Sequence, residues 1–192
     1  MRRIAHYWLK AEKWQHTEYA KSLSPVIRSL ILSTRSLTYE LEALYGASVE
    51  VELKQVGYRT IEPELAEYMG IPAGCKGFER EVWLIVGGRR LVYAVSIFSI
   101  EHTEERLISI LKEAQKPMGR VFVEENIPFE KEALEIATEI KDNKQFEFPV
   151  EEGLPVARRY RFSRKDKDGR WFINGAVAEV FSPELLQFKK ER

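Results

Sequence analysis

The 192-residue sequence has a single cysteine, Cys75, and only three histidines, and this scarcity excludes several kinds of site. One thiol cannot form a disulfide within the chain, and His6, His16 and His102 do not have the spacing of a zinc site. We therefore expect no metal site. The low cysteine content is typical of a protein that works in the reducing cytoplasm.

Net charge and long apolar runs are also missing. The 30 basic and 30 acidic side chains cancel, so there is no overall field to attract nucleic acid or an anionic membrane. The positively charged start of the chain has no apolar run long enough for a signal peptide or a membrane span. We expect a cytoplasmic protein with neither a nucleic-acid nor a membrane partner.

The motifs of common cofactor and covalent chemistry are absent as well. The sequence contains no glycine-rich phosphate loop, no dinucleotide fingerprint and no nucleophile elbow, so we expect no cofactor. A basic and aromatic run covers residues 158–161, but on a strand only Arg159 and Arg161 would share a face. This favours a solvated strand over a contact with nucleic acid.

The patterns that are present predict one compact domain. With 44% hydrophobic residues, the chain suits a single domain at 22–192, preceded by an extension at 1–21 that is either a short helix or a packed arm. Helical spacing predicts helices, and apolar–polar alternation predicts strands. The expected helices cover residues 24–32, 37–45, 61–69, 104–112 and 129–140, and the expected strands cover residues 48–58, 78–86, 90–100, 146–150, 154–163 and 171–181. Together they predict an α+β fold, an antiparallel sheet of about six strands with helices on one face.

Two charges fall on the apolar faces of expected strands. Glu179 shares a face with Val177 and Phe181, and Arg80 shares a face with Phe78 and Val82. A charge inside an apolar surface is costly unless it is paired or awaits a ligand. The two side chains therefore either neutralise each other in a closed core or line a pocket for a small anion.

A second candidate for anion binding is the polar break at residues 33–36, which separates two expected helices. A helix that starts after such a break exposes backbone N–H groups, which can hold an anion. A plain connection between helices is the alternative.

An ordered set of motifs resembles the chorismate pyruvate-lyase family, in its archaeal-type form. The similarity covers roughly residues 22–185 and rests on the order of the motifs. They are Arg80-Glu81 before a glycine turn, residues 116–120 (KPMGR) after a helix, Arg158-Arg159 on a strand, and Glu179 in AEVFSP. The resemblance implies a chorismate lyase-like fold and a cofactor-independent carbon–oxygen lyase that cleaves chorismate to 4-hydroxybenzoate and pyruvate.

The same resemblance implies roles for four residues. Arg80 would bind the carboxylate of the aromatic product, and Glu179 would contact its hydroxyl end, so these two are the expected catalytic residues. Backbone N–H groups of Leu37 and Met118 would complete a site for an aromatic or cyclohexadiene carboxylate. Leu37 stands in Ser-Leu-Thr where bacterial members have Ser-Met-Thr, which a backbone contact tolerates.

A non-catalytic protein of the same fold is the second hypothesis, because the family fold resembles the effector-binding domain of bacterial transcription regulators. Such a protein would bind a small anion without turning it over. The 21 residues before the first matched helix are too few for a DNA-binding domain, so we do not expect a complete regulator.

Overall fold

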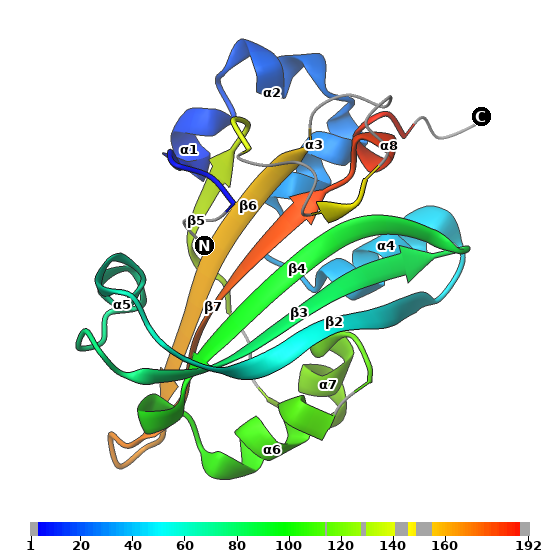
Figure 1. The fold of residues 1–192 in the computed structure, drawn as a ribbon. Helices are drawn as coiled ribbons and strands as arrows, with labels where there is room; N and C mark the ends of the chain where they lie inside the picture. Colours follow the sequence, from blue (N-terminus) through cyan, green and yellow to red (C-terminus); the bar gives the residue numbers. More distant parts are fainter. Residues whose placement is uncertain (1–3, 114, 128–129, 141–145, 149–154, 189–192) are drawn as a thin grey trace.

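The computed structural model describes residues 4–113, 115–127, 130–140, 146–148 and 155–188 (Figure 1). Its elements follow the chain in this order: β1 (Leu9–Lys10), α1 (Ala11–Trp14), α2 (Glu18–Ser22), α3 (Pro25–Leu32), α4 (Leu37–Tyr45), β2 (Val49–Thr60), α5 (Pro63–Met69), β3 (Lys76–Val86), β4 (Arg89–Ser99), the 3₁₀ turn η1 (Ile100–His102), α6 (Glu105–Glu113), α7 (Met118–Glu124), β5 (Glu132–Ala137), β6 (Val156–Lys165), β7 (Trp171–Phe181) and α8 (Pro183–Leu186). The α+β fold class is confirmed.

The strands form one antiparallel sheet in the order β1-β5-β6-β7-β4-β3-β2. The β3–β4 hairpin turns at Gly87 and Gly88, whose φ angles of 57° and 76° are those of a tight hairpin turn that side chains other than glycine rarely adopt. The β6–β7 hairpin places β7 beside β4, so β7 and β4 are central strands. Residues on these two strands are therefore buried on both faces of the sheet.

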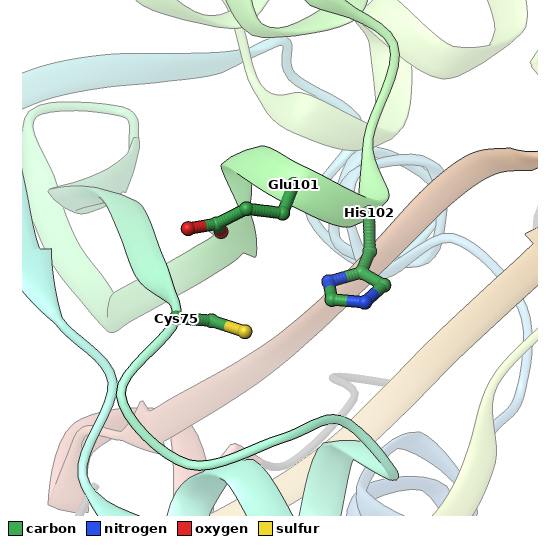
Figure 2. Close-up of side chains that lie close together, drawn as sticks. All are labelled: Cys75, Glu101 and His102. Atoms are coloured by element: carbon green, nitrogen blue, oxygen red, sulfur yellow. The ribbon is translucent and has the colours of Figure 1, made fainter.

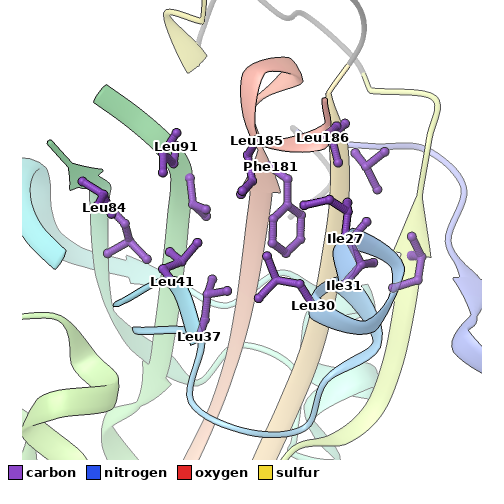
Figure 3. Packing of buried hydrophobic residues seen from close by; sticks show 14 of the residues in the cluster. Ile27, Leu30, Ile31, Leu37, Leu41, Leu84, Leu91, Phe181, Leu185 and Leu186 are labelled. Atoms are coloured by element: carbon purple, nitrogen blue, oxygen red, sulfur yellow. The ribbon is translucent and has the colours of Figure 1, made fainter. Parts of the chain in front are cut away.

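Most of the helices cover one face of the sheet, which we call the helical face (Figure 1). Ser24 and Pro25 start α3 as expected, because the Ser24 hydroxyl accepts a hydrogen bond from the Ile27 N–H. Figure 3 shows how α3 and α4 pack their apolar side chains against the strands, around Phe181. Farther along the same face, α6 and α7 pack on Phe78, Phe98 and Phe162.

The opposite face carries α5, together with the chain around Phe146 and the start of the described chain. Its core is apolar and includes Trp83, Tyr93 and Ala178. Within the described ranges, α5 departs from the expected arrangement with all helices on one side.

Two predicted elements are wrong. Residues 129–140 were expected to be a helix, but Glu132–Ala137 form strand β5, which hydrogen-bonds to β1 on one side and β6 on the other. The sequence there fits both periods, and the two neighbouring strands decide the outcome. Phe146–Phe148 lie outside the strands, and residues 149–150 lie outside the described residues.

The first 21 residues contribute to the fold through β1 and through Trp14 and Ala20, which are buried against the α3–α4 layer. The expected boundary between an extension and a domain at residue 22 stays a prediction. In the described ranges, no helix is both long and apolar enough to cross a membrane.

Candidate functional site

Two rows of facing residues cross the helical face of the sheet, and all of them except Arg158 line one cavity. In the first row, Arg80 faces Ser96, Ser96 faces Val177, and Val177 faces Tyr160. In the second row, Val82 faces Ala94, Ala94 faces Glu179, and Glu179 faces Arg158. Because β4 lies between them, strands β3 and β7 are about 10 Å apart. Both side chains line the cavity, at 4% and 5% exposure.

Glu179 is held in a buried polar network. Its Oε2 accepts a hydrogen bond from Arg158 Nε at 2.5 Å, and its Oε1 accepts one from the Tyr160 hydroxyl at 3.0 Å. Burial pushes the pKa of Glu179 up, but the charges of Arg158 and Lys131 and these hydrogen bonds outweigh it and hold the pKa below its ordinary value. Glu179 is therefore a carboxylate at neutral pH.

Arg158 has no exposed surface and anchors this network to the helix layer. Its Nη1 donates to the carbonyl oxygens of Leu30, Ile31 and Ser33, at the end of α3, at 2.8, 3.0 and 3.1 Å. Those carbonyls carry the negative end of the helix dipole, which suits a guanidinium. The prediction of a solvated strand is wrong for Arg158 and Tyr160, because both point into the core.

The other two arginines of that basic run lie on the opposite face, and they pair with β5. Arg159 Nε lies 2.7 Å from Glu135, and Arg161 Nε lies 3.5 Å from Glu132. These pairs join β6 to its neighbour in the sheet. Glu135 and Glu132 thus neutralise two arginines of the basic run at residues 158–161.

Two helix starts converge on the Arg80 end of the cavity. Leu37 and Met118 are the first residues of α4 and α7, and both line the cavity. Neither helix has a side-chain cap hydrogen bond, whereas Ser24 and Ser182 cap α3 and α8. The Ser36 hydroxyl, at the start of α4, is buried without a hydrogen-bond partner. The cavity thus meets the positive ends of two helices, an arrangement suited to an anion.

Gly119 allows this close approach of the two helix starts. A Cβ atom built at Gly119 would lie 2.3 Å from Ser36 Oγ and 3.1 Å from Thr38 Oγ1. Arg120, on the next position of α7, forms an ion pair with Glu42 of α4 and holds the helices together. Arg80 itself donates from Nη2 to the Lys116 carbonyl at 3.0 Å, just before α7.

Lys131 is a cavity residue that the sequence did not single out. It is 7% exposed, its Nζ donates to the Ser33 carbonyl at 3.3 Å, and it lies 4.7 Å from the centre of the Tyr160 ring. Burial lowers its pKa to about 7, with the Arg158 charge acting in the same direction. Its position just before β5 carried no sequence signal, because that segment was expected to be helical.

All four residues that the sequence pointed to, Leu37, Arg80, Met118 and Glu179, lie around this one cavity. Glu179 is ion-paired to Arg158, a partner that neither alternative for the two inward charges named. The sequence missed Lys131, and it placed Arg158 and Tyr160 in solvent. Arg158 could have been found from its spacing of two from Tyr160, which places both on one face of a strand.

Comparison with known proteins supports a family assignment. The family model described as Chorismate pyruvate-lyase Rv2949c-like matches residues 31–189. A "Probable chorismate pyruvate-lyase" of Pseudomonas aeruginosa (strain UCBPP-PA14) is 25% identical over 174 residues, which cover 90% of this chain and 92% of that protein. A Pseudomonas putida protein of the same description is 31% identical over 108 residues, or 56% of this chain and 59% of that protein.

Solved structures share the fold at much lower identity. PhnF from Mycobacterium smegmatis aligns with a TM-score of 0.60 and 15% identity, over 82% of this chain and 68% of that one. The effector domain of the same protein aligns with a TM-score of 0.59 and 15% identity, over 82% and 94%. The ligand-binding domain of a putative GntR-family regulator from Bordetella bronchiseptica aligns with a TM-score of 0.53 and 9% identity, over 76% and 91%.

Proposed function

This chain belongs to the Rv2949c-like family of chorismate pyruvate-lyases, and from this premise we propose that it cleaves chorismate to 4-hydroxybenzoate and pyruvate. The observation that carries the proposal is the placement of buried Arg80 and ionised Glu179 across one cavity, with β4 between their strands. Such a cavity can orient a ring that bears a carboxylate at one end and oxygen substituents at the other.

Charge supports an anionic ligand. Arg80 and Lys131 line the cavity, and the single carboxylate that lines it, Glu179, is already neutralised by the buried Arg158. The two uncapped helix starts add partial positive charge. Chorismate is a dianion, so its two carboxylates would enter a site with an excess of positive charge.

Arg80 would fix the ring carboxylate. A guanidinium forms two parallel hydrogen bonds to a carboxylate, which sets the plane and the direction of the ring. The N–H groups of Leu37 and Met118, at the two helix starts, would support the same anionic end. In this arrangement Arg80 and the two helix starts bind the substrate and the product.

Glu179 would act at the oxygen-bearing end of the ring. The reaction breaks the bond between the ring carbon and the ether oxygen and removes one ring proton; the enolpyruvate that leaves gains one proton on its methylene carbon and becomes pyruvate. Protons balance, nothing is oxidised or reduced, and no cofactor is required. Because the ring becomes aromatic, the protein mainly positions the substrate and stabilises charge.

The Tyr160 hydroxyl supports this role of Glu179. Burial raises the pKa of Tyr160 well above its ordinary value, and the neighbouring Glu179 charge raises it further. Tyr160 therefore stays protonated and keeps donating to Glu179. Glu179 would in this way be an oriented carboxylate that either accepts the ring proton or holds the substrate beside the departing oxygen.

The experiment follows both products from purified chain and chorismate, 4-hydroxybenzoate by its aromatic absorbance and pyruvate by a coupled dehydrogenase. We expect equal amounts of both. Glu179→Gln should lower kcat by roughly 10²-fold, near the lower end of the usual span of 10²–10⁴ for a positioned acid or base. Val180→Ala, at the neighbouring buried position on the opposite face, is the matched control and should keep kcat.

Two outcomes would count against the proposal. Wild-type turnover in folded Glu179→Gln would remove Glu179 from the chemistry. Saturable binding of chorismate by calorimetry, with neither product formed, would favour the second candidate, a protein that binds a small anion without turning it over. That candidate draws on the fold shared with the PhnF effector domain.

A further inference from the structure

A second cluster of reactive side chains lies where β3 begins and β4 ends. In the β3–β4 register, Gly77 faces Ser99. Just beyond this pair, Cys75 precedes β3 and lies close to Glu101 and His102, which belong to the 3₁₀ turn η1 after β4. Figure 2 shows the Cys75 thiol between the side chains of Glu101 and His102. None of these three residues lines the cavity of the proposed lyase site.

The three side chains are spaced for a metal ion. One ligand atom from each lies within 4.8 Å of the other two. Three atoms so placed all lie within about 2.8 Å of a common point, less than 1 Å beyond the 2.0–2.3 Å bonds that zinc forms with nitrogen, oxygen and sulfur. Small rotations of the exposed Glu101 and the half-buried Cys75 and His102 would close this gap. The fourth position of a tetrahedral ion would remain open to solvent.

Neighbouring groups hold the candidate ligands in place. Ser99 has no exposed surface, and its hydroxyl lies 2.8 Å from His102 Nδ1 and 3.4 Å from Glu101 Oε2. The Lys76 N–H donates to Glu101 Oε1 at 2.9 Å, and Trp171 packs edge-on against the His102 ring. These contacts orient the His102 ring and the Glu101 carboxylate.

We propose that Cys75, Glu101 and His102 form a site for a divalent transition-metal ion of the zinc class. A thiolate and a carboxylate would neutralise the ion, and a neutral imidazole would complete the protein ligands. Thiolate and imidazole select borderline-soft ions over magnesium and calcium. The bound ion would join the start of β3 to the end of β4, so it would stabilise the fold at the outer end of this strand pair. The spacing of cysteine and histidine along the sequence gave no sign of this site, because Cys75 meets Glu101 and His102 only where β3 and β4 pair.

Cobalt titration of the metal-free full-length chain tests the proposal. Co²⁺ bound through sulfur gives an intense thiolate charge-transfer absorption, and Cys75 is the only thiol in the sequence. We expect the absorption to saturate at one ion per chain and to disappear when Zn²⁺ displaces Co²⁺. Cys75→Ser should abolish it, and Glu101→Gln and His102→Ala should each weaken Co²⁺ binding by about tenfold or more. His16→Ala, which changes an exposed histidine outside the cluster, should leave binding unchanged.

A second measurement keeps the proposal testable if a variant does not fold. In the wild-type chain, stoichiometric Zn²⁺ should protect Cys75 from alkylation and raise Tm, whereas Mg²⁺ should do neither. Absence of the charge-transfer band at stoichiometric Co²⁺ would overturn the proposal. Unchanged affinity in both Glu101→Gln and His102→Ala would overturn it too, because the thiol would then be binding the ion alone.

Discussion

The two faces of the sheet bury different chemistry on the same strands. At the centre of β7, Ala178 and Val180 face the α5 side and lie in an apolar core, whereas the residue between them, Glu179, faces the helical side and is ion-paired to Arg158. On β6, Arg159 on the α5 side retains some solvent contact, while Arg158 on the helical side has none.

This difference separates a face with an apolar core from the face that holds the proposed site. The α5 face places its charges at the margins, where the ion pairs of Arg159 and Arg161 with β5 are partly hydrated. The helical face places its charges at the centre, where each must be compensated inside the protein. A fold that needed only a core would not require the second arrangement, so matched substitutions on the two faces should have different consequences.

The largest expected effect is on stability, at neighbouring positions of β6. Arg158→Met should lower the free energy of unfolding by about 3–5 kcal/mol, because it leaves Glu179 buried without its cation. Arg159→Met, whose ion pair faces the other way and is partly exposed, should cost about 1 kcal/mol or less. Urea unfolding of both variants measures the contrast.

A double variant sharpens this contrast. Arg158→Met combined with Glu179→Met removes both charges. The double variant should therefore lose less unfolding free energy than the sum of the losses in the two single variants. Equal losses for Arg158→Met and Arg159→Met would contradict the distinction between the two faces.

A smaller effect is expected on binding, at neighbouring positions of β3. Arg80→Lys should weaken 4-hydroxybenzoate binding by about 1–3 kcal/mol, because an ammonium cannot form the two parallel hydrogen bonds of a guanidinium. Glu81→Gln, on the α5 face where Glu81 accepts a hydrogen bond from the Tyr93 hydroxyl, should leave binding unchanged. Calorimetry with both variants checks this, and unchanged affinity in Arg80→Lys would make Arg80 a structural residue.

A further effect, spread over a window of pH instead of present at a single pH, is a pH dependence of stability from Lys131. Its pKa of about 7 in the folded protein lies below the ordinary value of 10.5, so between these values folding releases a proton and raising the pH favours the folded state. The stability of the wild type relative to Lys131→Met should therefore increase with pH from about 7 to 10.5 and be flat below that window. Unfolding curves of the two proteins across this range measure it, and a constant difference would show that Lys131 does not titrate.

Period-2 alternation predicted strands β3 and β7 and the inward direction of Arg80 and Glu179, and the apolar run beside Gly87-Gly88 predicted β4. Local signals such as Ser24-Pro25 and Gly87-Gly88 predicted the start of α3 and the β3–β4 turn. These predictions succeeded because each depends on a few adjacent residues. The failure at residues 129–140 has the opposite cause, since a segment compatible with both periods takes the structure that its neighbours in the sheet impose.

The sequence by itself determined the α+β class, the paired apolar strands and the presence of two charges inside them. Only the tertiary structure decided which charges meet. Glu179 pairs with Arg158 because β6 and β7 are adjacent in a register that places these two residues face to face. Lys131 reaches the same network from before β5, and Cys75 lies beside Glu101 and His102 for a similar reason. Contacts between residues far apart in the chain depend on strand order and register, which no local pattern encodes.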